Sequence, residues 1–146
     1  LLLEGAGPPS LWPGFWKNVG EAGNLEPFVS SRHKDVMLTP VAKEFQNAYV
    51  KKSGKEPADY KSRSMYNTLR IAADAINRAG STDADKLVDA LEKSDLTVCS
   101  GQVKFGTEKG SYRYHQWQPP MLIIQWQDKQ QVVVYPKDAA TGQLKK

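Results

Sequence analysis

The sequence contains a single cysteine in 146 residues, so no disulfide bond can form within the chain. Cys99 lies in the segment LTVCSG, which has the composition of a β-strand. A lone cysteine in such a segment is typical of a small buried apolar residue. Scarcity of cysteine fits either the cytoplasm or an exported protein that needs no disulfides, so it leaves the compartment open.

Histidine is nearly as scarce, because His33 and His115 are the only two in the chain. They are far apart, and no cluster of cysteine or acidic residues accompanies either, whereas a metal site needs three or four ligands. His33 stands in the polar segment SSRHKD and is predicted to face solvent. We therefore expect no metal site.

The motifs of common enzymes and cofactor sites are also missing. The sequence has no phosphate-binding loop, no nucleophile elbow and no paired carboxylates. Gly5 and Gly7 do not form a dinucleotide fingerprint, because the third glycine is absent and Pro8 and Pro9 follow. We expect no cofactor, and a hydrolase or other enzyme is disfavoured.

Long apolar runs are absent too, and nothing approaches the roughly 20 apolar residues of a membrane span. The opening Leu1–Leu3 is too short for the core of a signal peptide, and without an initiator methionine the chain is expected to start inside a longer precursor. The net charge is +4, but the lysines and arginines are scattered. This distribution favours a solvated surface over a nucleic-acid-binding one.

The middle of the chain has the pattern of three helices. Thr39 and Pro40 are a strong helix start, and Gly54 ends that helix, whose predicted buried face consists of Val41, Phe45, Ala48 and Tyr49. The next helix is predicted over 64–79 with Gly80 after it. Its predicted core stripe is Met65, Leu69, Ala72, Ala73 and Ile76, widened by Ile71 and Ala75. A third helix begins near Thr82 and directs Leu87, Val88 and Leu91 to the core.

Strand patterns flank these helices. Residues 25–30 are predicted to form an edge strand, because Pro27 cannot donate a backbone hydrogen bond. Residues 96–99 and 101–105 have strand composition. Residues 121–126 and 131–135 are predicted to form a hairpin. The polar tail after Lys137 is predicted to fray.

Four segments in fixed order carry a family resemblance: FQNAYVKKSGKEP, MYNTLRIAADAINRAGSTDADKLVDAL, LTVCSGQVKFGTEKG and PPMLIIQWQDKQQVVVYP. Together they resemble the C-terminal part of a type I periplasmic solute-binding protein of the branched-chain amino acid ABC transporter family. The resemblance covers roughly residues 11 to 140. The chain departs from the family pattern at Asn67 and Gly106, where aspartate is common, and at Lys129, where glycine is common.

The resemblance implies an α/β fold, the C-terminal fragment of the two-lobed type I fold, with helices packed on a sheet plus a C-terminal β-hairpin. It places residues 1–30 and 118–146 in one lobe and residues 31–117 in the other. The first half of the family's chain has no counterpart here. We therefore expect this chain alone to expose apolar surface. The missing N-terminal half, a homo-oligomer or a domain swap would cover that surface.

The function implied by the resemblance is capture rather than chemistry. Such a protein is the substrate-binding component of an ABC importer, is periplasmic or extracellular, closes two lobes on a small ligand and delivers it to the permease. The implied ligand is an amino acid, an amide or a small carboxylate, aromatic ones included. The alternative is a cytoplasmic ligand-sensing regulatory receptor of the same fold, against which a signal peptide in the coding sequence upstream would argue.

Five residues are candidate ligand contacts. Glu4, Gly5 and Ala6 form a loop after the strand-like Leu1–Leu3, and by resemblance the Glu4 carboxylate pairs with a ligand ammonium group. Phe15 would wall the pocket, although its helical spacing with Trp12 and Trp16 also fits a core position. Tyr66 begins a helix that faces the cleft in the family. For Glu4 the alternative is an exposed acid in a loop.

Overall fold

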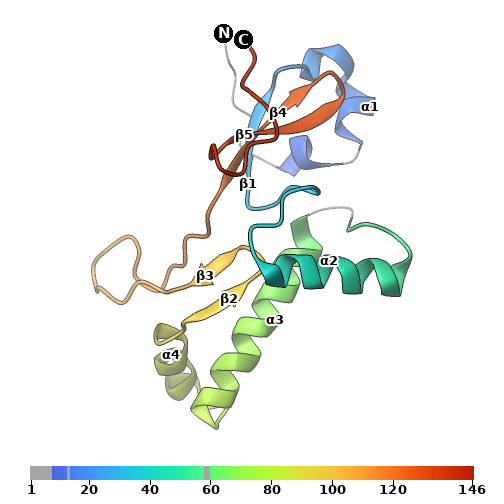
Figure 1. Cartoon of the computed structure of the whole chain (residues 1–146). Helices are drawn as coiled ribbons and strands as arrows, with labels where there is room; N and C mark the ends of the chain where they lie inside the picture. Colours follow the sequence, from blue (N-terminus) through green and yellow to red (C-terminus); the bar gives the residue numbers. More distant parts are fainter. Residues whose placement is uncertain (1–7, 13, 58–59) are drawn as a thin grey trace.

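A computed structural model of the chain describes residues 8–12, 14–57 and 60–146. Its helices and strands fall into two groups, one above the other in Figure 1. The upper group, here the sheet module, consists of η1 (Pro8–Leu11), α1 (Phe15–Val19), η2 (Gly20–Gly23), β1 (Pro27–Ser30), β4 (Leu122–Gln127) and β5 (Gln130–Tyr135). The lower group, the helical module, consists of α2 (Pro40–Ser53), α3 (Tyr60–Ala79), α4 (Ala84–Glu92), β2 (Leu96–Val98) and β3 (Gly101–Val103).

The sheet module is built on an antiparallel sheet in the order β1-β4-β5. The edge position of β1 agrees with the prediction made from Pro27. The predicted hairpin is also present, and its turn consists of Asp128 and Lys129 with φ of 51° and 72°. Two left-handed residues in succession match the right-handed twist of the strands they join. The core beneath the sheet consists of Phe15, Phe28, Leu122, Ile124, Trp126 and Val133.

Helix α2 has the predicted caps. The Thr39 side chain accepts a hydrogen bond from the Ala42 N–H at 3.1 Å, and Gly54 ends the helix in the left-handed region with φ 69°. The buried face differs from the prediction, because Ala42, Phe45 and Gln46 are buried and Ala48 is exposed. Ala42 and Phe45 pack with Cys99 in a second, smaller core, so the buried face of the helix is centred on them and excludes Ala48.

Helix α3 differs most from expectation. The predicted apolar stripe is exposed, with Met65 at 60%, Leu69 at 65% and Ile76 at 40%. The buried positions are Arg63, Asn67 and Ala75, which are spaced at multiples of four residues, and of these only Ala75 belongs to the predicted stripe. Helix α3 contacts α4 and β2, whereas Met65, Leu69 and Ile76 stay exposed among the described residues.

Helix α4 begins one residue later than expected, because the N-cap is Asp83 and not Thr82. The Asp83 side chain accepts a hydrogen bond from the Lys86 N–H at 3.2 Å. Leu87 and Leu91 are half-buried, and Val88 is 42% exposed, so the predicted core face is only partly buried. None of the helices in the described part of the chain combines the length and the apolar character that crossing a membrane requires.

The departure at Gly106 has a local cause. A Cβ atom at this position would collide with the carbonyl oxygen of Arg113. The close approach is held by two backbone hydrogen bonds, from the Gly106 N–H to the Gln116 carbonyl and from the His115 N–H to the Gly106 carbonyl, at 3.0 and 2.7 Å. Glycine is therefore required at this position, where the resemblance leads us to expect aspartate.

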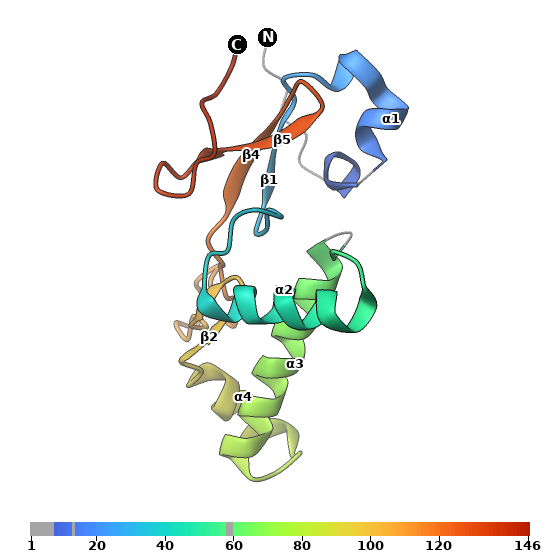
Figure 2. The ribbon, with the colours of Figure 1, turned by 45° about the vertical axis from the view of Figure 1, so that its right-hand side comes forward.

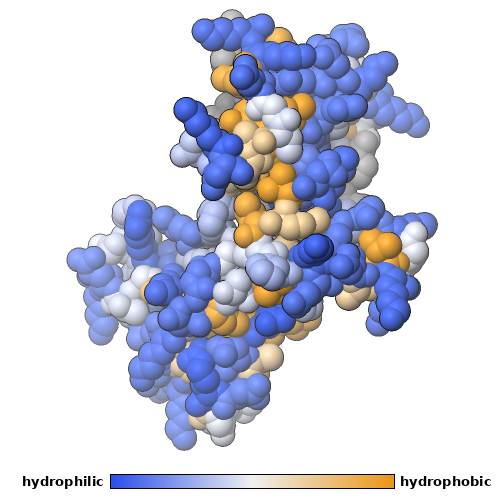
Figure 3. Space-filling view, viewed as in Figure 1, coloured by the Kyte–Doolittle hydropathy of each residue, from blue (hydrophilic) through white to orange (hydrophobic). Residues whose placement is uncertain are grey.

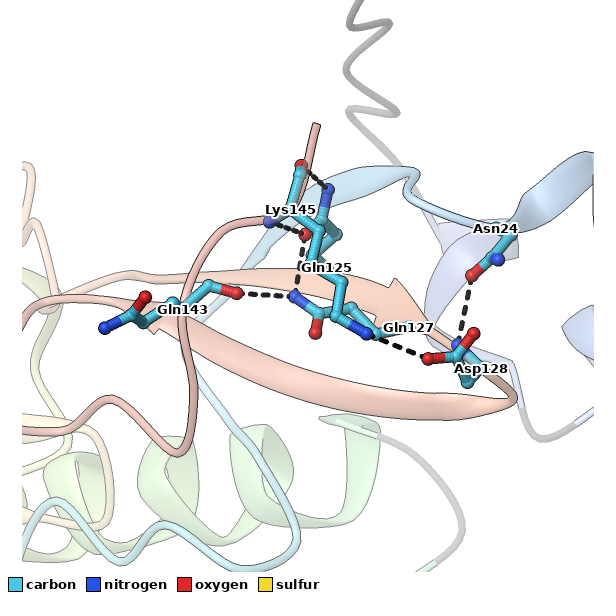
Figure 4. Close-up of polar contacts among 6 residues, drawn as sticks. All are labelled: Asn24, Gln125, Gln127, Asp128, Gln143 and Lys145. Atoms are coloured by element: carbon cyan, nitrogen blue, oxygen red, sulfur yellow. Dashed lines mark hydrogen bonds and ion pairs between the residues drawn. The ribbon is translucent and has the colours of Figure 1, made fainter.

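The C-terminal tail was predicted to fray, and this is wrong. Buried glutamines of β4 hold it (Figure 4): the Gln127 amide donates to the Gln143 carbonyl at 2.7 Å. The Gln125 side chain both donates to the carbonyl and accepts from the N–H of Lys145, at 3.0 and 2.9 Å. The polar composition of the tail suggested disorder, but its backbone satisfies side chains that the sheet buries.

Candidate functional site

A cavity of about 410 Å³ lies between the sheet module and the helical module. This volume is in the range that holds a small molecule. Residues from four separate segments of the chain line it. They are Leu11, Trp126, Lys129, Gln130 and Gln131 of the sheet module, Glu56 and Pro57 of the helical module, and Arg32, His33, Lys34 and Asp35 between them.

The segment 31–38, which joins β1 to α2 and is here called the connector, lies between the two modules in both ribbon views (Figure 2). Hydrogen bonds tie it to both sides. Arg32 Nη2 donates to the Pro57 carbonyl at 2.6 Å, and the His33 Nε2 lies 3.0 Å from the Gln131 carbonyl. The connector therefore joins the two modules and also lines the cavity, while a second link, residues 104–121, joins β3 to β4.

His33 was predicted to face solvent, and this is wrong, because it is only 2% exposed. Its Nδ1 accepts a hydrogen bond from the Asp35 N–H at 3.2 Å, so the proton of the neutral ring lies on Nε2 and is donated to the Gln131 carbonyl. Burial lowers the pKa of His33 below its ordinary value of 6.5, and the hydrogen bond to Gln131 opposes that shift. The neutral ring is thus the form that fits the cavity wall.

We expect His33 to make the protein less stable in weak acid. The folded state holds the ring neutral, so below about pH 6.5 the unfolded state binds the extra proton first and the free energy of unfolding falls. The stability is therefore present above about pH 6.5 and is lost as the pH falls toward the lowered pKa. The measurement is the urea midpoint at pH 7.5 and pH 5.5 in a His115→Gln background, where His33 is the only histidine. His33→Gln in that background should reduce the difference between the two midpoints, and an unchanged difference would contradict the assignment.

The polar lining of the cavity carries more positive than negative charge. Arg32, Lys34 and Lys129 stand against Asp35 and Glu56. Lys34 and Asp35 form an exposed ion pair at 2.7 Å, and the Glu56 carboxylate accepts a hydrogen bond from the Gln46 amide. The hydrogen bond from the neutral Gln46 amide leaves Glu56 charged, so the lining carries charged groups of both signs.

The apolar wall comes from Leu11 and Trp126. Trp126 is 6% exposed, its ring stacks on Phe15 with a centroid distance of 5.5 Å, and its Nε1 donates to the Ser10 carbonyl at 3.0 Å. A side chain packed on one side and bonded at its edge is fixed in orientation. The cavity thus combines a rigid aromatic surface with cationic groups.

Of the predicted contact residues that the structure describes, Phe15 and Tyr66 do not line this cavity. Glu4, Gly5 and Ala6 lie outside the described residues. Phe15 is buried in the sheet core, behind Trp126. Tyr66 packs on Phe45 with a centroid distance of 4.9 Å in the core of the helical module. Their roles in ligand binding stay predictions.

The lining residues were not found from the sequence. The one signal that pointed to them was Lys129, which stands in a tight turn where glycine is common and adopts φ 72°. Trp126 and the connector residues gave no local signal. Among residues 8–12, 14–57 and 60–146, no group of three or more histidine, cysteine, aspartate or glutamate residues could hold a metal ion.

Comparison with known proteins gives a family for this chain. A family model described as periplasmic binding protein matches residues 8–131. Among curated proteins, Leu/Ile/Val-binding protein homolog 8 of Brucella abortus (strain 2308) is 31% identical over 111 residues, which are 73% of this chain and 26% of that protein. Leu/Ile/Val-binding protein homolog 7 of Brucella melitensis biotype 1 is 29% identical over 108 residues, or 74% of this chain and 27% of that protein. The chain therefore spans about a quarter of the length of these relatives.

Solved structures share the fold. A leucine binding protein from Thermotoga maritima matches with a TM-score of 0.67 and 24% identity over 83% of this chain and 33% of its own. A solute binding protein of an R. palustris ABC transporter, in complex with benzoate, matches with a TM-score of 0.64 and 15% identity over 92% of this chain and 35% of its own. The α/β fold class and the resemblance drawn from the sequence are confirmed: the chain belongs to the periplasmic binding protein family, together with binding proteins of branched-chain amino acid ABC transporters.

Proposed function

We propose that this chain belongs to the substrate-binding component of an ABC importer, which captures a small solute between two lobes and delivers it to a membrane permease. The observation that carries the proposal is the cavity of about 410 Å³ between the modules of a chain in the periplasmic binding protein family. The proposed lobes are residues 1–30 with 118–146, and residues 31–117. In this proposal the protein binds without chemical conversion and works in the periplasm or outside the cell.

The connector supports a closing motion. Its hydrogen bonds to Pro57 and Gln131 attach it to both modules. The contacts of a ligand with the connector and with either wall therefore change when one module moves relative to the other. A ligand shifts such a motion only by binding the closed state better than the open one. The proposed solute is an amino acid, an amide or a small carboxylate, in line with the leucine and benzoate named for the similar solved proteins.

Isothermal titration calorimetry with leucine, isoleucine, valine and benzoate tests the proposal on the purified protein. We expect at least one of them to bind, and small-angle X-ray scattering to show a smaller radius of gyration in its presence. Asn77→Ala, at an exposed position of α3 outside the cavity lining, serves as a control that should leave the affinity unchanged. Absence of binding across the panel, or binding with no change in dimension, would count against capture by closure.

Association with further protein is part of the proposal. Exposed apolar side chains lie along α3 and α4, with Met65, Leu69, Ile76 and Val88 between 40% and 65% exposed. Figure 3 shows apolar side chains gathered also in the middle of the face it views, between the two modules. Surfaces of this kind are usually covered. We expect these side chains to be covered by the N-terminal half of the family's longer chain, by a second copy of this chain or by a swapped segment.

A further inference from the structure

Helix α3 has an exposed face that carries no charge. Between residues 64 and 76 the exposed uncharged residues are Ser64, Met65, Thr68, Leu69, Ala72, Ala73 and Ile76. The two charged residues in that stretch are Arg70 and Asp74, and at about 100° per residue both project away from Leu69 and Ala72. Charged residues make up 25% of the whole chain, so their absence from this face is a local feature. Depletion of charge marks the centre of a protein interface.

Four residues of this face have the spacing of a helix–helix contact. Met65, Leu69, Ala72 and Ile76, here called the α3 seam, follow one another at intervals of four, three and four residues. This alternation is the spacing of the buried seam in a coiled coil, where side chains of one helix insert between those of another. The large members of the α3 seam are exposed among the described residues. The seam is therefore built for a facing helix that the described chain does not supply.

A groove lies beside the α3 seam, between α3 and α4. Its volume is about 350 Å³, and its lining is apolar apart from Thr68. The apolar lining includes Ile71, Ala72 and Ile76 of α3, Leu87 and Leu91 of α4, and Phe105 after β3. Ala72 belongs to both the seam and the groove, and its small side chain leaves the groove open to a residue that faces it.

The α3 seam is complementary to a second copy of itself. When two α3 helices pack antiparallel about a twofold axis midway between Leu69 and Ala72, each Leu69 faces Ala72 of the other copy. Each Met65 then faces Ile76. A projecting leucine thus meets a small residue beside an open groove, which is a knob-into-hole contact. A parallel pair would instead place Ala72 against Ala72 and leave the groove unfilled, and only the antiparallel pair brings opposite ends of the helix dipoles together.

We propose that a second copy of this chain covers the α3 seam, through a symmetric antiparallel contact in which Leu69 of each copy enters the groove beside Ala72 of the other. The proposal rests on the association stated in the proposed function and narrows it to one occupant. Residues 64–76 are about 20 Å long at 1.5 Å per residue, so the buried area lies at the small end of specific interfaces. The dimer is therefore weak, with a dissociation constant in the micromolar range, and depends on protein concentration.

Sedimentation velocity of the whole 146-residue chain tests the proposal at protein concentrations from about 1 µM to about 200 µM. Dimers should appear as the concentration rises. Leu69→Lys should raise the dissociation constant at least about tenfold, because two like charges then lie close together near the twofold axis. Ala72→Glu should do the same for the same reason. Ala48→Lys adds a positive charge at an exposed position of α2 and is the control that should leave the dimer unchanged.

Mixing the two variants tests the register of the contact. In an equimolar mixture the lysine introduced by Leu69→Lys faces the glutamate introduced by Ala72→Glu, so more dimer should form than in either variant alone at the same total concentration. Both changes are at exposed positions, and far-UV circular dichroism confirms that each variant is folded. Association that Leu69→Lys leaves unchanged, or a mixture that recovers no dimer, would overturn the proposal.

A chain that stays monomeric at every concentration would also overturn the proposal, and would favour the N-terminal half of the family's longer chain as the cover. The residues of the α3 seam do not line the cavity between the modules, so solute capture is measured separately. Calorimetry on Leu69→Lys should give the same solute affinity as on the parent chain. If solute binds and no dimer forms, this proposal fails while capture stands; if the dimer forms and no solute binds, capture fails while this proposal stands.

Discussion

Replacing Trp126 by alanine should lower the free energy of unfolding by about 3 to 5 kcal/mol, the usual range for a large buried aromatic side chain. The indole is 6% exposed, and its ring lies 5.5 Å from Phe15 and 5.8 Å from Trp16, measured between centroids. Its N–H donates to the Ser10 carbonyl, which joins strand β4 to the N-terminal turn η1. The substitution therefore leaves a cavity in the core, loses two ring contacts and removes a bond between distant segments. Urea unfolding followed by far-UV circular dichroism measures the loss.

Trp12→Ala is the matched control. Trp12 is 51% exposed, so its loss should change the free energy of unfolding by less than about 0.5 kcal/mol. If Trp126→Ala lowered the free energy of unfolding no more than Trp12→Ala, Trp126 would not be packed against α1 as the structure has it. Because Trp126 also lines the cavity, the variant should lose ligand affinity under conditions where it is still folded. A small stability loss with full affinity would contradict both roles.

The parts of the fold that the sequence predicted correctly depend on residues close together in the chain. The Thr39 cap and the Gly54 stop of α2 each involve partners within four residues, and the Asp128–Lys129 turn joins two adjacent strands. The edge position of β1 follows from the missing donor of Pro27 alone. Such features are set by local sterics and hydrogen bonding, so a sequence pattern specifies them.

The parts that it did not predict depend on distant partners. His33 looked exposed in a run of polar residues, yet its ring is bonded to the carbonyl of Gln131, 98 positions away. The cavity likewise combines segments near residues 11, 33, 56 and 130. Two of them lie in segments that carry the family resemblance, but no local pattern brings the four together. The apolar stripe of α3 was read correctly as a stripe, but which face of a helix is buried depends on what packs against it. Among the described residues, the buried face of α3 is the one that contains Arg63 and Asn67.

The second large loss in the free energy of unfolding is expected when Asn67 is replaced by alanine. The resemblance leads us to expect aspartate here, and the asparagine is 5% exposed. Its Oδ1 accepts from the Cys99 N–H at 2.9 Å, and its Nδ2 donates to the Ser100 hydroxyl oxygen at 3.0 Å. The two bonds attach α3 to the turn between β2 and β3. Asn67→Ala leaves the N–H of Cys99 buried without its acceptor and opens a small cavity, so we expect a loss of about 2 to 3 kcal/mol in the free energy of unfolding.

Amide hydrogen exchange gives a readout at a single site, because protection of the Cys99 N–H should fall in Asn67→Ala more than that of its neighbours. Asn67→Asp keeps an acceptor for that N–H and can accept from the Ser100 hydroxyl in place of donating to it, so it should cost less than alanine. Asn77→Ala, at an exposed position of the same helix, should cost less than about 0.5 kcal/mol. If Asn67→Ala and Asn77→Ala were equally mild, the bond to Cys99 would not hold the helix to the hairpin. If Asn67→Asp were as damaging as alanine, burial of a charge would outweigh the hydrogen bonds, and the asparagine would be required by its neutrality alone.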